Sequence, residues 1–140
     1  MSMGGPVNSP LDTAVRNAIR TGLSIVVATG HESQNTDHSS PSRVLEAVVV
    51  GAVDGNNKKA RFSNFGPSLK VWAPGVGIPS AWTDGPNLVK KLDGTSMAAY
   101  VYLVKMTKFF FGKLTMEQSD LASLDIWPWH SVEATSLHRS

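Results

Sequence analysis

The sequence has 140 residues, of which 41% are hydrophobic and 17% are charged, and its formal net charge is +2. These values are typical of one globular domain with a buried core and exclude a disordered chain. The small net charge, without a basic cluster interleaved with aromatics, argues against a nucleic-acid partner, and the lack of cysteine excludes disulfides and thiolate metal sites.

The first predicted element is a helix that begins at Ser9. Ser9 is a suitable N-cap, Pro10 suits the first helical position, and Asp12 suits the first turn. Apolar residues then recur at helical spacing up to Gly22, which is expected to end the helix.

Two short runs rich in β-branched residues predict strands over 23–28 and 47–53. Both lack an alternating polar face, as is typical of strands buried in a parallel sheet. The order strand, helix, strand predicts a right-handed βαβ crossover. Residues 31–42 are polar and rich in turn-forming residues, and they are expected to form a surface loop.

The second half begins with a turn signal at 54–57, and short strands and loops are expected from there to about residue 92. The most apolar stretch, 97–111, is too short and too charged to span a membrane, so it predicts a buried helix with Gly112 as its C-cap. The remaining residues show no clear periodicity beyond a short helix predicted over 116–124.

The chemical signal lies at the start of the apolar stretch, in Asp93-Gly94-Thr95-Ser96-Met97-Ala98. A serine that opens a helix places its hydroxyl near unpaired backbone N–H groups and the positive end of the helix dipole. Developing negative charge is stabilised there, as a nucleophile that generates an oxyanion requires.

Gly94-Thr95-Ser96-Met97-Ala98 resembles the nucleophile motif of the subtilisin-like serine proteases, closest to the proteinase K-like branch. Further matching segments follow in family order and spacing: Ser2-Met3-Gly4-Gly5, 25–30, 49–53, 62–66 and 72–78. The resemblance covers residues 1–112, which correspond to the C-terminal part of the catalytic domain, and leaves 113–140 as a divergent tail. It implies an α/β fold, a partial subtilisin-like parallel sheet flanked by helices.

The resemblance makes Ser96 the catalytic nucleophile. A serine hydroxyl is inert until a general base takes its proton. The family uses a histidine oriented by an aspartate, both in the N-terminal half of the domain. Neither the His-Gly-Thr segment nor the Asp-Thr/Ser-Gly segment occurs in these 140 residues, and none of the four histidines matches the catalytic one.

The oxyanion position also departs from the family pattern. The family has Asn after Ala-x-Gly, whereas His31 follows Ala28-Thr29-Gly30. An imidazole N–H donates only in the right tautomer and from a different distance. The resemblance implies that the substrate cleft is lined by Met3, Gly4, Gly5, Ala28, Thr29 and Gly30.

No cofactor or metal is expected. In the proteinase K branch a carboxylate helps to bind calcium, but the matching residue is Lys70, whose charge repels the ion. Glu32, Asp37 and His38 share one loop, but their spacing fits no closed metal site. Tyr100 and Tyr102 stand where the family has small residues, which implies altered packing of that helix.

Two functions remain open. The first is a serine-type endopeptidase by family, truncated and inactive as an isolated chain; the second is a non-catalytic pseudoprotease remnant that binds peptide or a protein partner. Peptides or proteins are the expected substrates, without a nucleic-acid or membrane partner, and self-association through an uncovered core is possible. No signal peptide is visible after Met1, so the localisation is left open.

Overall fold

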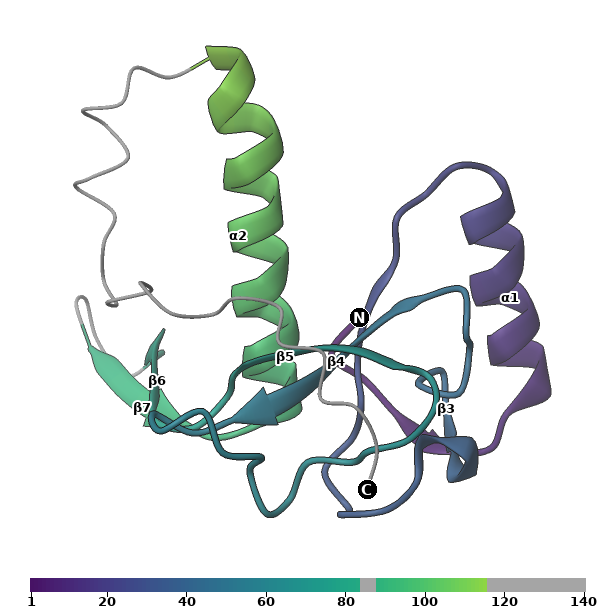
Figure 1. The fold of residues 1–140 in the computed structure, drawn as a ribbon, viewed down its shortest axis with the longest axis horizontal. Helices are drawn as coiled ribbons and strands as arrows, with labels where there is room; N and C mark the ends of the chain where they lie inside the picture. The colour runs from purple at the N-terminus through teal and green to yellow at the C-terminus, as the bar shows by residue number, and fades with distance from the viewer. Residues whose placement is uncertain (84–87, 116–140) are drawn as a thin grey trace. The chain divides into compact units, whose positions relative to one another are not determined.

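The computed structural model describes residues 1–83 and 88–115. In chain order the elements are β1 (Gly5–Pro6), α1 (Ser9–Arg20), β2 (Val26–Ala28), η1 (Thr36–His38), β3 (Ser39–Ser40), β4 (Val48–Val53), β5 (Leu69–Pro74), β6 (Ile78–Ala81), β7 (Val89–Leu92) and α2 (Thr95–Thr115) (Figure 1). The chain divides into two compact units, residues 1–106 and 107–140. The helix predicted over 116–124 lies outside the described residues.

The centre of the first unit is a three-stranded sheet in the order β2-β4-β5, and both pairs are parallel. All three residues of β2 are buried, as are five of the six in β4, which fits strands covered on both faces. The predicted parallel sheet is therefore confirmed. The strand expected over 23–28 begins only at Val26, because α1 ends at Arg20 and residues 21–25 form the connection between the two elements.

The first residue of the chain lies beside β2 and is hydrogen-bonded to it. The Met1 amino group donates to the carbonyl of Val26, and the Ala28 N–H donates to the carbonyl of Met1 at 3.0 Å, which is a parallel pairing pattern. The chain then passes through α1 into β2, but β1 pairs antiparallel with β3 in a separate sheet, so β1, α1 and β2 do not form the predicted βαβ crossover. The connection from β2 to β4 contains η1 and β3 but no α-helix.

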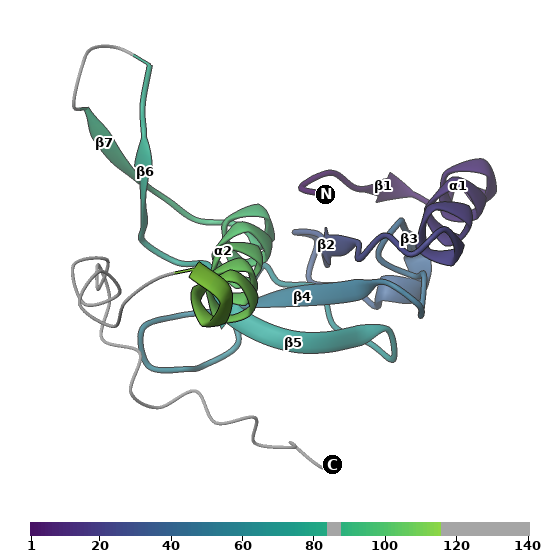
Figure 2. The same cartoon turned by 90° about the horizontal axis from the view of Figure 1, so that it is seen from above.

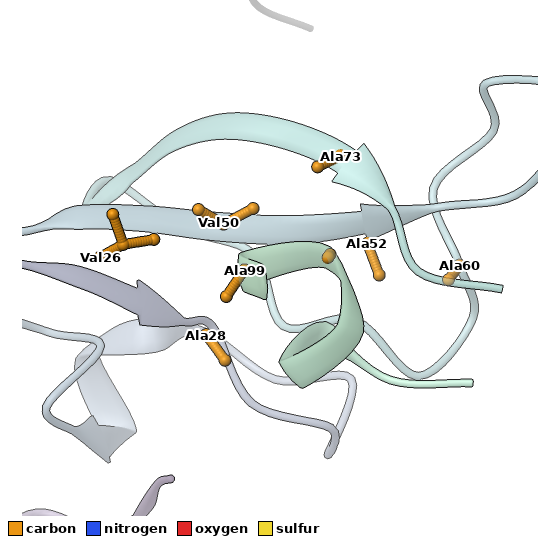
Figure 3. Close-up of a cluster of buried hydrophobic side chains, with 8 residues drawn as sticks. Val26, Ala28, Val50, Ala52, Ala60, Ala73 and Ala99 are labelled. Atoms are coloured by element: carbon orange, nitrogen blue, oxygen red, sulfur yellow. The ribbon is translucent and has the colours of Figure 1, made fainter. Parts of the chain in front are cut away.

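Alternate residues of the strands point to opposite faces and form two separate cores. The alanine cluster contains buried residues of the sheet, of α2 and of a loop: Val26, Ala28, Val50, Ala52, Ala60, Ala73, Ala98 and Ala99 (Figure 3). The valine cluster joins the other side of the sheet to α1 and the β3–β4 loop: Val15, Val27, Val44, Ala47 and Val49.

The N-cap of helix α1 lies one residue earlier than the sequence predicted. Asn8, rather than Ser9, is the N-cap: its backbone is extended and its side-chain oxygen accepts the N–H of Leu11 at 3.0 Å. Gly22 ends the helix as predicted, because its N–H donates to Ile19 and the N–H of Leu23 donates to Ala18, at 2.9 and 3.3 Å.

Helix α2 is longer than predicted, and Gly112 lies inside it rather than at its end. Its first turns are buried, with Ala98 and Ala99 only 0% and 3% exposed. Tyr100 is 66% exposed, whereas Tyr102 packs against the edge of the alanine cluster. Within residues 95–109, the helix expected to be buried on every side is therefore buried only near its start, and neither tyrosine is fully buried.

The last two strands form a separate antiparallel hairpin. Ile78 pairs with Leu92, and Ala81 pairs with Val89. Figure 2 shows β6 and β7 as a ribbon distinct from β2, β4 and β5. No helix in residues 1–83 and 88–115 combines the length and the hydropathy that a membrane crossing requires.

Candidate active site

An open pocket of about 130 Å³ lies where the chain start, the end of β2 and the start of α2 meet. It contains Ser96, His31 and every residue that the sequence predicted for the substrate cleft. Its complete lining is Ser2, Met3, Gly4, Gly5, Ala28, Thr29, Gly30, His31, Glu32, Ser39, Thr95 and Ser96. Ser2, Glu32, Ser39 and Thr95 were not predicted.

The first turn of α2 carries Ser96 into this pocket, where it is half-buried. The turn is held by a hydrogen bond from the Gly94 N–H to the Gly75 carbonyl at 2.7 Å. A Cβ on Gly75 would lie 2.6 Å from the Cβ of Ala52 and 2.7 Å from the Gly94 carbonyl oxygen. Only glycine at position 75 lets the helix start approach the sheet so closely, so the placement of Ser96 depends on it.

The Ser96 hydroxyl contacts the backbone rather than a base. Its Oγ donates to the carbonyl of Ser2 at 3.5 Å, and the Ser2 hydroxyl donates to the carbonyl of Ser96 at 3.4 Å. Both distances are at the long limit for hydroxyl donors, so these bonds are weak. In the part of the chain that the structure describes, no imidazole is hydrogen-bonded to Ser96.

A second link joins the helix start to the end of β2. The Gly30 N–H donates to the Thr95 hydroxyl at 3.3 Å. Gly30 has a φ of 106°, and a Cβ there would lie 2.4 Å from the side-chain nitrogen of Asn64. Glycine is therefore required at this position by both its backbone conformation and the space around it.

Asn64 is a site residue that the sequence analysis did not single out, although it lies in the matching segment 62–66. Its side chain is fully buried. Its Nδ2 donates to the Thr29 carbonyl at 3.0 Å and to the Glu32 carboxylate at 2.7 Å. Its Oδ1 accepts the N–H groups of Glu32 and Gln34 at 3.0 and 2.9 Å. One side chain thus fixes the loop that forms the pocket wall.

His31 lies on that loop with its side chain exposed. Its ring stacks on Phe62, with 3.9 Å between ring centroids and 5° between ring planes. Its backbone N–H donates to the Glu32 carboxylate at 2.8 Å. The stacking holds the imidazole at the pocket in one orientation.

The chain start forms the opposite wall of the pocket. Gly5 and Pro6 pair antiparallel with Ser40 and Ser39 of β3. Met3 precedes this pair, and its side chain is 60% exposed. An extended backbone beside an open pocket provides N–H and C=O groups that pair with an added peptide strand.

The residue at the position of the family's calcium-binding carboxylate does not fit a calcium ion. Lys70 is exposed on β5, and its ammonium group provides no oxygen ligand. Glu32, Asp37 and His38 form no joint site either, because residues 1–83 and 88–115 contain no group of three or more His, Cys, Asp or Glu side chains able to hold a metal.

Comparisons with known proteins agree with this arrangement. A family model described as the subtilase family matches residues 1–100. A cuticle-degrading serine protease of Arthrobotrys oligospora is 45% identical over 98 residues, which cover 70% of this chain and 24% of that protein. An extracellular serine proteinase of a Thermus species is 44% identical over 98 residues and covers the same two shares, 70% and 24%.

A solved structure extends the match to the fold. A cold-adapted subtilisin-like serine proteinase superposes with a TM-score of 0.74 at 35% sequence identity, over 81% of this chain and 41% of that chain. The chain spans only 24% of the length of each of the two curated relatives named above. The resemblance and the partial subtilisin-like α/β fold expected from the sequence are confirmed, and this chain belongs to the subtilase family.

Proposed function

We propose that the pocket is the substrate cleft of a serine endopeptidase and that Ser96 is its nucleophile. The observation that carries the proposal is the position of Ser96 on the first turn of α2, in one pocket with residues 3–5 and 28–30. A peptide that pairs with the chain start would present its carbonyl carbon to the Ser96 hydroxyl. The helix dipole would then stabilise the oxyanion that forms.

Hydrolysis requires a base that these residues do not supply. When Ser96 Oγ attacks a peptide carbonyl, its proton must leave, first to a base and then to the amine of the departing peptide. The Ser2 carbonyl accepts a hydrogen bond from Ser96, but a backbone carbonyl does not take up the proton. The proposed activity therefore needs the family's histidine and aspartate from outside these 140 residues.

Two further features belong to the same proposal. The Ser96 backbone N–H would donate to the oxyanion, with His31 in the position of the family's asparagine. No calcium would be bound at Lys70, because its charge opposes the ion.

Peptide binding without hydrolysis is the second candidate function. It is supported by the contact of Ser96 with the carbonyl of Ser2 and by the replacement of the usual amide donor with an exposed imidazole. In this case the cleft would hold a peptide or a protein segment that is not cleaved.

A chimera distinguishes the two candidates. This chain is joined to the part of the Arthrobotrys oligospora protease that precedes the matched region, and casein hydrolysis is measured. We expect hydrolysis that Ser96→Ala abolishes and that Ser24→Ala, a change at an exposed serine outside the pocket, leaves intact. A folded chimera that binds peptide without cleaving it supports the second candidate instead.

We also propose that the isolated chain associates with a second copy of itself. The support is apolar surface on α2, where Tyr100 and Leu103 are 66% and 46% exposed, and the position of β5 at an edge of the described sheet. Exposed apolar patches and open sheet edges both favour association.

A further inference from the structure

Asn64 binds the pocket loop on both sides of His31. Before His31, it donates through Nδ2 to the Thr29 carbonyl at 3.0 Å, and its backbone N–H donates to the Gly30 carbonyl at 3.2 Å. After His31, its Oδ1 accepts the Glu32 N–H at 3.0 Å. Residue 31 is thus the middle of a segment that one buried asparagine fixes at both ends.

The same amide also orients the acidic side chain next to His31. Asn64 Nδ2 donates to Glu32 Oε2 at 2.7 Å, and that oxygen also accepts the His31 N–H at 2.8 Å. The two hydrogen bonds connect the Asn64 amide to the His31 backbone through the Glu32 carboxylate. A charged acceptor makes these bonds stronger than bonds between neutral groups.

An asparagine meets these requirements through its two different ends. The amide nitrogen donates to two oxygens, and the amide oxygen accepts two backbone N–H groups. An aspartate of the same shape would keep the acceptor but lose both donors, and it would place a second carboxylate beside Glu32. Alanine would leave three backbone groups and the Glu32 carboxylate without this partner.

We propose that Asn64 is a positioning residue: it holds His31 against Phe62 at the pocket and so sets the shape in which the cleft receives a peptide. The proposal rests on the proposed function in one respect only, namely that the pocket binds peptide. The placement of the His31 ring can be tested without any peptide.

The first measurement is the proton NMR spectrum of the 140-residue chain. The stack on Phe62 places the His31 ring protons in the shielding region above an aromatic face. We therefore expect an upfield shift of these protons that Phe62→Leu removes. Asn64→Asp is expected to remove it as well, although Phe62 is still present.

A paired substitution tests which contacts of Asn64 matter. In the double variant Asn64→Asp, Glu32→Gln one donor again faces one acceptor between residues 64 and 32. The amide of residue 32 then takes the place of Oε2 and cannot accept the His31 N–H, and the Thr29 carbonyl stays without its donor. We therefore expect the upfield shift to remain lost. Asn35→Asp is the matched control, because Asn35 lies on the same loop but outside the pocket and uses only its oxygen, toward the Asp37 N–H at 3.0 Å.

The second measurement is the affinity for a fluorescein-labelled Ala-Ala-Ala-Leu amide, followed by fluorescence anisotropy. We expect Asn64→Asp to weaken binding about tenfold, comparable to the loss of one buried hydrogen bond, and the double variant to remain as weak. Thermal unfolding of each variant shows whether it is folded. Asn64→Ser is the substitute if Asn64→Asp does not fold, and it predicts the same loss of shift.

The outcomes separate the two proposals. An unchanged His31 shift in folded Asn64→Asp or Asn64→Ser overturns the positioning role, whatever the affinity. A double variant with a full upfield shift also overturns it, because neither the Thr29 carbonyl nor the His31 N–H has regained its partner there. If the unaltered chain shows the shift but binds no peptide, peptide binding by this chain fails while the positioning of His31 stands.

Discussion

The two faces of the sheet are packed with side chains of different size. The valine cluster fills one face with branched side chains beneath α1, a helix with a cap at each end. The alanine cluster fills the other face with small side chains, which let the start of α2 come close to β4. The large side chains form a core that stabilises the fold, whereas the small ones let the start of α2 place Ser96 in the pocket.

The contrast extends to the charged and apolar side chains that each helix carries. Helix α1 has an acidic residue in its first turn and a basic one in its last, in agreement with the helix dipole. Helix α2 has no acidic residue in its first turn and carries exposed apolar side chains soon after it. The face that presents Ser96 is therefore also the face with uncovered apolar surface.

The largest expected effect is on catalysis by the 140-residue chain itself. We expect neither casein hydrolysis nor labelling of Ser96 by a fluorophosphonate probe, because the alanine cluster places the hydroxyl but supplies no base. Removal of the base costs about six orders of magnitude in kcat in subtilisin, a member of the same family. Ser96→Ala is the control, and stoichiometric labelling that this change abolishes would contradict the expectation.

The next effect concerns His31 in the chimera described above. We expect His31→Asn to raise kcat by roughly 10²-fold, because an amide donor at the oxyanion position is restored, and the loss of one such donor in subtilisin costs about that much. Steady-state kinetics on casein-derived peptides measures the change. An unchanged kcat in an active chimera would mean that the imidazole already donates well or that another step limits the rate.

A smaller effect tests whether the alanine cluster depends on the close approach of the start of α2 to the sheet. Gly75→Ala should lower the free energy of unfolding by roughly 1–3 kcal/mol, because its Cβ would overlap neighbouring atoms. Gly5→Ala is the matched control, since a Cβ on Gly5 meets nothing within 4 Å. Urea denaturation measures both. Equal stabilities would show that the start of α2 shifts at little cost.

Self-association should depend on the α2 side of the molecule. We expect Tyr100→Lys to weaken the association of two copies by about tenfold, that is about 1.4 kcal/mol, because it removes exposed apolar surface. Thr13→Lys, at an exposed position of α1, should leave it unchanged. Analytical ultracentrifugation measures the dissociation constant. If the chain without substitutions stays monomeric at high concentration, the proposal is contradicted.

The smallest effect tests the cap on the α1 side. Asn8→Ala should destabilise the chain by about 1 kcal/mol, because the Leu11 N–H loses its acceptor. Ser9→Ala should change the stability little, since Ser9 lies inside the helix. The unfolding midpoints in urea compare the two variants. A larger loss of stability in Ser9→Ala than in Asn8→Ala would show that Ser9 is the N-cap.

The sequence by itself determined those features that local patterns encode. The β-branched runs identified β2 and β4, Gly22 marked the end of α1, and the motif around Ser96 identified the family. Each of these signals depends on a few neighbouring residues, so no knowledge of distant contacts was needed. The choice between Asn8 and Ser9 as cap failed because both residue types are good caps and only the backbone conformation separates them.

Only the tertiary structure decided how distant segments meet. The hydrogen bonds of Asn64 to Thr29 and Glu32 cross more than 30 positions in the sequence, and nothing in the local pattern around Asn64 indicates its partners. The same holds for Gly75: a side chain is excluded there because Ala52 and Gly94 lie too close. The exposure of α2 likewise depends on what covers it, because an apolar pattern records a side chain's preference for burial and not the presence of a neighbour that provides it.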